Sequence, residues 1–291
     1  MSQRLRRLFI ALALVPVSLA VAASWHVLLT PKARPVSRRV HVPSTPERIA
    51  RGEYLARRVT ACFHCHSEVD PDRLGAPPKP AVEGQGRVFP LPDLPGRIIA
   101  GNLTPDESSG LGAWTDDELL RALREGVDRS GRALHPAMPY EAFRSLSDDD
   151  AQALVAFLRS LPPARTSLPI TRLNARTRFA ISSIPTPLRS AVPPPEPGPG
   201  NATAQGRYLA TIARCLNCHS CADHAPTFID RMSREGFIAR FRSMGSFPRG
   251  QEPVVSPALN TPMPWTALGG MSEDDLGAIH DYLKSVPTPM Q

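Results

Sequence analysis

The feature that most constrains the fold of this chain is a Cys-x-x-Cys-His motif that occurs twice within a longer repeat. The motif reads CFHCH at 62–66 and CLNCH at 215–219. Further along, PAMPYEAF at 136–143 resembles TPMPWTAL at 261–268. The chain has 291 residues, enough for one large core or two ordinary ones. Because the same elements recur in the same order, we predict two units of one fold.

Each unit is predicted to be helical. Ser147 and Ser272 each precede acidic residues and an apolar pattern of helical period, and Pro162 and Pro287 end these helices. A middle helix is expected in each unit, at 115–126 and at 234–245, and the first of these opens with a Thr-x-x-Glu capping box. No strand pattern is present, so the predicted fold class is all-α.

The predicted domains follow from this repeat and from composition. They are a membrane anchor or signal peptide at 1–30, a first domain at 45–163, a proline-rich linker at 164–200 and a second domain at 201–288. The linker ends in AVPPPEPGPG, which is typical of a polyproline spacer. We therefore expect extended chain between the domains, and some freedom for one domain to move relative to the other.

The N-terminal segment is apolar between basic flanks. Residues 8–29 contain no Asp, Glu, Lys or Arg, and a helix of that length reaches about 33 Å, enough to span a bilayer. Ala20-Val21-Ala22 also fits a signal-peptide cleavage site, so an uncleaved anchor and a cleaved leader both remain open. Residues 1–48 carry eight basic residues and one acidic residue, which accounts for the whole net charge of +7. Residues 49–291 therefore carry no net charge, which argues against a nucleic-acid partner.

The two motifs have the spacing of a c-type haem attachment site. In such a site the two cysteines bind the haem as thioethers, and the adjacent histidine is a ligand of the iron. These roles fall on Cys62, Cys65, His66, Cys215, Cys218 and His219. A zinc site and a redox dithiol are the alternatives, although extra zinc ligands are few (His64 and His135 near the first motif; Cys221, His224 and His280 near the second).

A second iron ligand is expected from methionine, the usual partner of histidine in electron-transfer cytochromes. Met138 and Met263 occupy the same place in the repeat, and neighbouring prolines keep both out of a helix. The alternatives are Met271 in the second unit and His135 in the first. We expect His135 at the rim of the pocket, His64 in solvent, His280 on the surface and Cys221 as a free thiol.

Residues 102–143, together with FIARFRSMGS and NTPMPW in the second unit, resemble the cytochrome c subunits of membrane-bound alcohol, sugar and gluconate dehydrogenases. The resemblance covers nearly all of 47–288. It implies two class I cytochrome c domains in tandem, two covalently attached haems c with their iron, and a location on the periplasmic side of the bacterial inner membrane. Those subunits carry three haem motifs, whereas this chain has two.

Two function classes follow. The first is an electron-transfer protein that links a dehydrogenase or quinol donor to an oxidase, a soluble cytochrome or another terminal acceptor. The second is an enzyme of the di-haem peroxidase type, in which one iron would lack its methionine. The chain shows no nucleotide-binding loop, catalytic triad or paired carboxylates, so we assign no catalytic residue and favour electron transfer.

Overall fold

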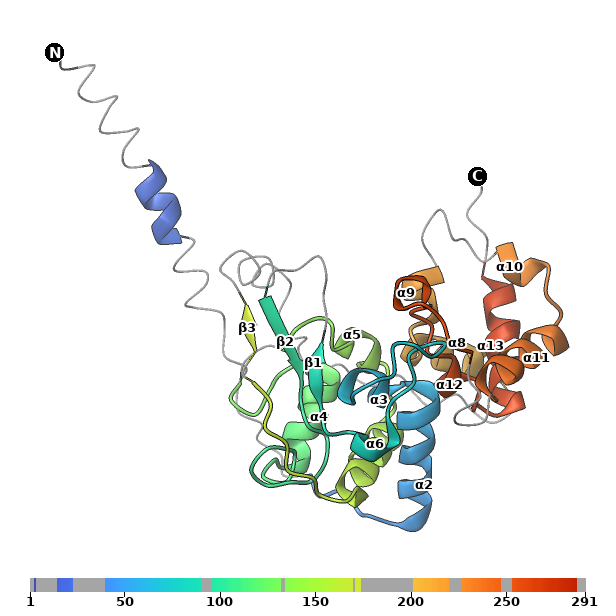
Figure 1. Ribbon diagram of the computed structural model, residues 1–291, viewed down its shortest axis with the longest axis horizontal. Coiled ribbons are helices and arrows are strands. Elements are labelled where there is room, and N and C mark those ends of the chain that lie inside the picture. The colour runs from blue at the N-terminus through green and yellow to red at the C-terminus, as the bar shows by residue number, and fades with distance from the viewer. Residues whose placement is uncertain are drawn as a thin grey trace.

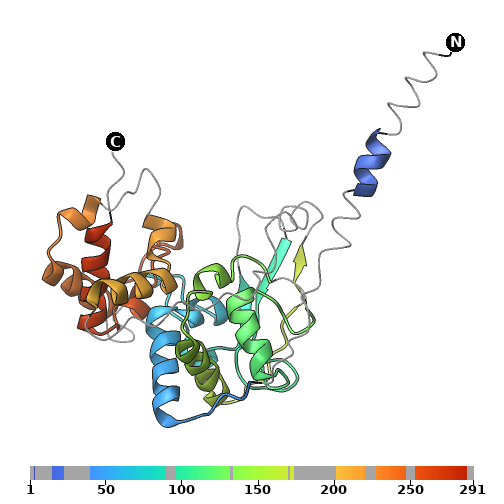
Figure 2. The ribbon, with the colours of Figure 1, turned by 180° about the vertical axis from the view of Figure 1, so that it is seen from behind.

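Two groups of helices lie side by side in the computed structural model (Figures 1 and 2). The structure describes residues 3, 15–22, 40–89, 96–131, 134–169, 171–173, 201–219, 227–246 and 253–286. The first group comprises α2 (Pro46–Tyr54), a π-helical turn (Leu55–Val59), α3 (Cys62–His66), α4 (Asp116–Glu125), α5 (Tyr140–Phe143) and α6 (Asp148–Ser160). The second comprises α8 (Ala202–Ile212), α9 (Cys215–His219), α10 (Thr227–Asp230), α11 (Arg234–Gly245), α12 (Trp265–Leu268) and α13 (Glu273–Ser285). Short 3-10 turns lie at Pro80–Val82 and Pro257–Leu259.

The two groups are built on the same helix crossing. In the first group α2 packs on α6, and in the second α8 packs on α13. At each crossing, a glycine allows the backbones of the two helices to come into close contact. A β-carbon on Gly52 would lie 1.9 Å from the carbonyl oxygen of Ala153, and one on Gly206 would lie 1.9 Å from that of Ala278. A larger residue at either position would force the helices apart, so the repeat preserves a close backbone contact.

The helix starts are those that the sequence predicts. The Thr115 hydroxyl accepts the N–H of Glu118, whose side chain accepts the N–H of Thr115 in return, so the capping box is present. Ser147 and Ser272 cap α6 and α13 by accepting the N–H of the residue three positions on. The predicted middle helices are observed as α4 and α11.

A small antiparallel sheet corrects the expectation that strands are absent. It consists of β1 (Arg87–Phe89), β2 (Gly96–Ala100) and β3 (Arg172–Leu173), in that order. The third strand comes from the predicted linker, whose first residues are extended against the first group. There Asn102 donates to the carbonyl of Ala164 at 2.7 Å. These strands are too short to show an alternating pattern in the sequence.

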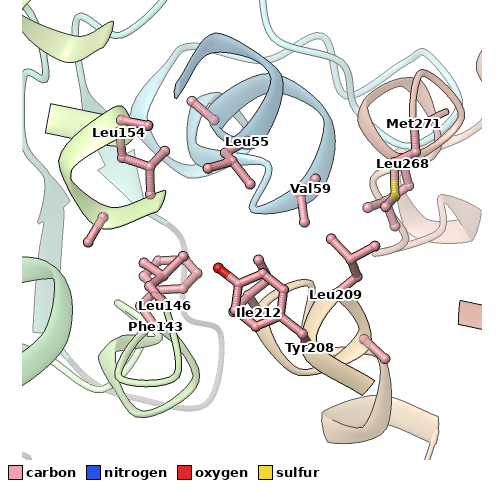
Figure 3. Packing of buried hydrophobic residues seen from close by; sticks show 14 of the residues in the cluster. Leu55, Val59, Phe143, Leu146, Leu154, Tyr208, Leu209, Ile212, Leu268 and Met271 are labelled. Carbon is pink, nitrogen blue, oxygen red and sulfur yellow. The ribbon is translucent and has the colours of Figure 1, made fainter. Parts of the chain in front are cut away.

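One hydrophobic core runs through both groups of helices. Figure 3 shows Leu55 and Val59 of the first group facing Leu209 and Ile212 of the second. All four side chains are at most 1% exposed and belong to a single buried cluster that also contains Met271. The groups are therefore joined by apolar burial, which is the main favourable contribution to association.

Reciprocal hydrogen bonds complete this junction. The Tyr54 hydroxyl donates to Asp275 at 2.5 Å and accepts the N–H of Ser272 at 3.0 Å. The Tyr208 hydroxyl donates to Asp150 at 2.6 Å and accepts the N–H of Ser147 at 3.3 Å. Each tyrosine thus binds the start of the last helix in the opposite group.

The loops form a second set of contacts between the groups. The carbonyl of Asp72 accepts the N–H of Val255 at 2.8 Å, and Asn260 donates to the carbonyl of Arg73 at 2.6 Å. Together with the shared core, these bonds are at odds with the expectation that the proline-rich linker lets one domain move freely. The groups share too much buried surface for that.

Several predictions from the sequence concern residues outside the ranges that the structure describes. Among the described residues, no helix combines the length and the apolar character needed to cross a bilayer. The apolar segment 8–29 lies outside the described residues except for 15–22, and Cys221, His224 and Pro287 also lie outside them.

Candidate haem-binding sites

Both Cys-x-x-Cys-His motifs form short helices that start in the same way. The residue before each motif, Ala61 or Arg214, has a left-handed backbone, with φ of 51° and 62°. This conformation is uncommon outside glycine. Its recurrence shows that the backbone enters both motifs in the same conformation. Helical geometry then brings the two cysteines of each motif and its histidine to neighbouring turns of α3 or α9.

The first motif presents its histidine in the form that binds a metal. The Nδ1–H of His66 donates to the carbonyl of Gly101 at 2.7 Å, which leaves Nε2 with its lone pair. Burial lowers the pKa of His66 and outweighs the opposing effect of the Gly101 bond. A neutral imidazole oriented through Nδ1 is the usual arrangement of a metal ligand, so His66 fits the proximal position of a haem.

The cysteines of both motifs are unpaired thiols in the structure. Burial raises the pKa of Cys62 to about 11 and that of Cys215 to about 12, and it also raises the pKa of Cys65. A zinc site needs thiolates, and these surroundings favour the neutral thiol. Within the described ranges, no three His, Cys, Asp or Glu side chains are grouped to hold a metal ion. The described residues therefore give no support to the zinc alternative.

Met138 and Met263 lie in identical turns. The carbonyl of Met138 accepts the N–H of Tyr140, and that of Met263 accepts the N–H of Trp265, both at 2.8 Å. The proline at the centre of each turn has φ and ψ of −83° and 51°, or −79° and 65°, values that define an inverse γ-turn. Both methionine side chains are half-buried against the core.

The two alternative ligands, Met271 and His135, lie in different surroundings. Met271 is fully buried and packs within the shared core. In His135, Nδ1 accepts the N–H of Ala137 at 3.0 Å, so the proton of the neutral ring is on Nε2. That Nε2 is buried and has no hydrogen-bond partner among the described residues.

Two histidines are not where the sequence placed them. His64 does not face solvent: its Nε2 lies 3.4 Å from the Thr266 hydroxyl of the other group, and burial lowers its pKa to about 4. His280 is not on the surface: it is 4% exposed, with ring nitrogens 2.9 Å from Asp281 and 3.1 Å from the carbonyl of Met232.

Sequence reasoning also missed Arg87, which lies beside the first motif. Its guanidinium donates to the carbonyl of His64 at 2.9 Å and to that of Cys65 at 3.3 Å. These carbonyls are at the C-terminal end of α3, where a cation is favourable. Arg87 follows a turn and is the first residue of the short strand β1, so no local pattern in the sequence marks it.

Comparison with known proteins identifies the class. Residues 47–158 match the family described as cytochrome C oxidase, cbb3-type, subunit III. The chain is 28% identical, over 257 residues, to the cytochrome c subunit of the quinone alcohol dehydrogenase of Gluconobacter oxydans (81% of this chain, 46% of that protein). It is 32% identical, over 181 residues, to the gluconate 2-dehydrogenase cytochrome c subunit of Pantoea cypripedii (59% and 38%). It is 35% identical, over 69 residues, to a di-haem c-type cytochrome of Cereibacter sphaeroides (24% and 23%).

The matched segment is a cytochrome c domain, and the chain is similar over most of its length to cytochrome c subunits. Its relatives include the cytochrome c subunits of dehydrogenases, and its cofactor is covalently attached haem c with iron. The chain spans less than half of the length of these three relatives. Their names give no support to the peroxidase alternative.

Proposed function

We propose that the protein is a di-haem electron-transfer cytochrome, in which both groups of helices are class I cytochrome c domains. The haem-binding residues would be Cys62, Cys65 and His66 in the first domain and Cys215, Cys218 and His219 in the second. The second iron ligands would be Met138 and Met263. Bound in this way, a haem supplies reversible one-electron chemistry, and the chain supplies ligands, burial and docking surfaces.

The observation that carries this proposal is the pair of identical methionine turns. A methionine that only filled the core would not need the same inverse γ-turn and the same 2.8 Å hydrogen bond in both units. A proline-fixed turn restricts the backbone, so the sulfur has few positions available and can stay on an iron through oxidation and reduction. If Met138 and Met263 held the irons together with the histidines, no ligand position would be left for a substrate, which favours electron transfer over catalysis.

The test is to remove each methionine in turn. Oxidised iron with a His/Met pair gives a weak sulfur-to-iron band at the red end of the visible spectrum. We expect Met138→Ala and Met263→Ala each to remove about half of this band and to lower one reduction potential. Met271→Leu is the control: it nearly conserves core volume and should leave both halves intact. If Met271→Leu removed the second half of the band and Met263→Ala did not, the assignment of Met263 as an iron ligand would be refuted.

For partners and location, the resemblance supports a site on the periplasmic side of the inner membrane and an electron donor that is a dehydrogenase or a quinol. We propose that residues 8–29 anchor the chain, because their length and apolar character suit a bilayer. N-terminal sequencing of the protein from the membrane fraction decides this. A mature chain that begins near Ala23 would mean a cleaved leader instead, whereas retention of Arg4, Arg6 and Arg7 would support the anchor.

A further inference from the structure

A cleft of about 520 Å³ lies between the two groups of helices. One wall is the first haem motif and the residues before it, including Arg58 and His64, and another is the proline-rich loop around Lys79. The second group closes the cleft with Gly245 at the end of α11 and with Thr266 and Ala267 of α12. The cleft is distinct from the methionine turns, because neither Met138 nor Met263 lines it.

The fixed charges of this cleft do not cancel. Its lining contains four cations, Arg57, Arg58, Arg73 and Lys79, and two carboxylates, Asp70 and Glu83. Arg57 is paired with Glu83 and also with Glu53, and Arg73 is paired with Asp70. In the part of the chain that the structure describes, neither Arg58 nor Lys79 forms an ion pair. Arg58 makes a 3.2 Å hydrogen bond to the carbonyl of Thr266, and Lys79 is exposed.

The unpaired cations lie beside the covalent attachment point of the first haem. Phe63 and His64, both within the Cys-x-x-Cys-His motif, line the same cleft. Lys79 stands between Pro78 and Pro80, whose fixed backbones limit the movement of the loop. A negatively charged group attracted to this cleft would therefore be held next to the haem-binding helix α3.

The cleft does not have the features of a pocket for a small ligand. Such pockets hold buried polar groups that converge on the ligand. Among the described residues, the buried side-chain atoms without a hydrogen-bond partner are Arg124 Nε, His135 Nε2 and Thr166 Oγ1, and none of these residues lines the cleft. Its cations without an ion pair are instead Lys79, which is exposed, and Arg58, which is partly exposed, so a partner surface can reach them.

We propose that this cleft is the docking site for an acidic segment of the redox partner, with Lys79 and Arg58 as the recognising cations. The proposal rests on the proposed electron-transfer function and deepens it by assigning the partner surface and the domain that receives it. A local positive cleft is compatible with a net charge of zero over residues 49–291, because the sum does not describe how the charges are distributed.

The experiment uses the full-length holoprotein and a fluorescent hexaglutamate peptide as the probe. Binding is followed by fluorescence anisotropy at low and at physiological ionic strength. We expect Lys79→Glu to weaken binding about tenfold at low salt, and Arg58→Gln to weaken it severalfold, with both differences shrinking at higher salt. Lys284→Glu is the matched control, because Lys284 is also exposed and lies outside the cleft, at the end of α13.

Three outcomes would overturn the proposal. The first is an equal loss of binding in Lys79→Glu and Lys284→Glu, and the second is no binding by the wild-type protein. The third is displacement of the peptide by inorganic phosphate at constant ionic strength, which would make the cleft a small-anion site. A redox titration of the same samples separates these failures from failure of the proposed function, since both haems would still titrate reversibly if only the docking site were wrong.

Discussion

The hydroxyl of Tyr54 lies 2.5 Å from a carboxylate oxygen of Asp275, on the first turn of the last helix in the opposite group. Tyr208 and Asp150 repeat this contact at 2.6 Å with the groups exchanged. Each aspartate has a further partner from the helix that carries the tyrosine of the other pair. Arg51 donates twice to Asp150 at 2.8 Å, and Gln205 donates to Asp275 at 3.3 Å. The orientation of the two groups is therefore fixed by polar contacts as well as by the core.

Removal of either hydroxyl should loosen this junction. We expect Tyr54→Phe and Tyr208→Phe each to lower the free energy of unfolding by about 1 to 2 kcal/mol, because each aspartate keeps its other partner. Denaturant unfolding of the holoprotein measures the change. Tyr282→Phe is the control, since the hydroxyl of Tyr282 forms no hydrogen bond with any of the described residues. Equal stability of all three variants and the wild-type protein would show that the contacts contribute nothing.

The same tyrosines should make the protein sensitive to alkali. Burial, aided by the hydrogen bond to Asp275, raises the pKa of Tyr54 to about 12, and burial also raises the pKa of Tyr208. In the unfolded chain a tyrosine ionises near pH 10. The contribution of Tyr54 is thus complete below about pH 10 and is lost as the pH rises toward about 12. Unfolding curves between these values should fall less steeply for the double Tyr→Phe variant; an unchanged slope would contradict the prediction.

The helix crossings should not tolerate a methyl group. In Gly52→Ala or Gly206→Ala, the new β-carbon would meet a carbonyl oxygen at 1.9 Å, so the helices must separate. We expect a loss of more than about 3 kcal/mol for each, measured by thermal unfolding. Gly101→Ala is the matched control, since nothing lies within 4 Å of its added carbon. Its melting temperature should match that of the wild-type protein, and a similar fall in all three variants would mean that close packing is not the cause.

The number of covalently bound haems per chain should equal the number of intact Cys-x-x-Cys-His motifs. Cys215→Ser combined with Cys218→Ser should reduce covalently bound haem from two per chain to one, because no thiol of the second motif is left to form a thioether. The pyridine haemochrome spectrum and the intact mass measure this. Cys221→Ser should leave both haems in place, since we predict a free thiol there. Loss of the second haem in Cys221→Ser would give that cysteine a role in attachment.

Local signals in the sequence were reliable in this chain. The caps at Ser147, Ser272 and Thr115 depend on residues at most three positions apart, and all three form as expected. The methionine turns are also local, because a proline on the C-terminal side of each methionine fixes the backbone. Such features need no knowledge of the rest of the fold.

Contacts between the groups could not be predicted in this way. Tyr54 and Asp275 are 221 positions apart, and the burial of His64 and His280 depends on segments that the sequence does not place. One signal was nevertheless present. Both first helices read Gly-x-Tyr, at Gly52-Glu53-Tyr54 and Gly206-Arg207-Tyr208, which marks the tyrosines as members of the repeat.

The surface that joins the two groups is close to self-complementary. Leu55 and Val59 correspond in the repeat to Leu209 and to a neighbour of Ile212, and each set faces the other (Figure 3). Such an isologous arrangement is the usual geometry of a homodimer, so the chain resembles a dimer whose subunits have been fused by a linker. We expect a fragment that ended near residue 163 to expose Leu55, Val59 and Leu146 and to self-associate through them. Studies of one half in isolation would then describe a pair, not a monomer.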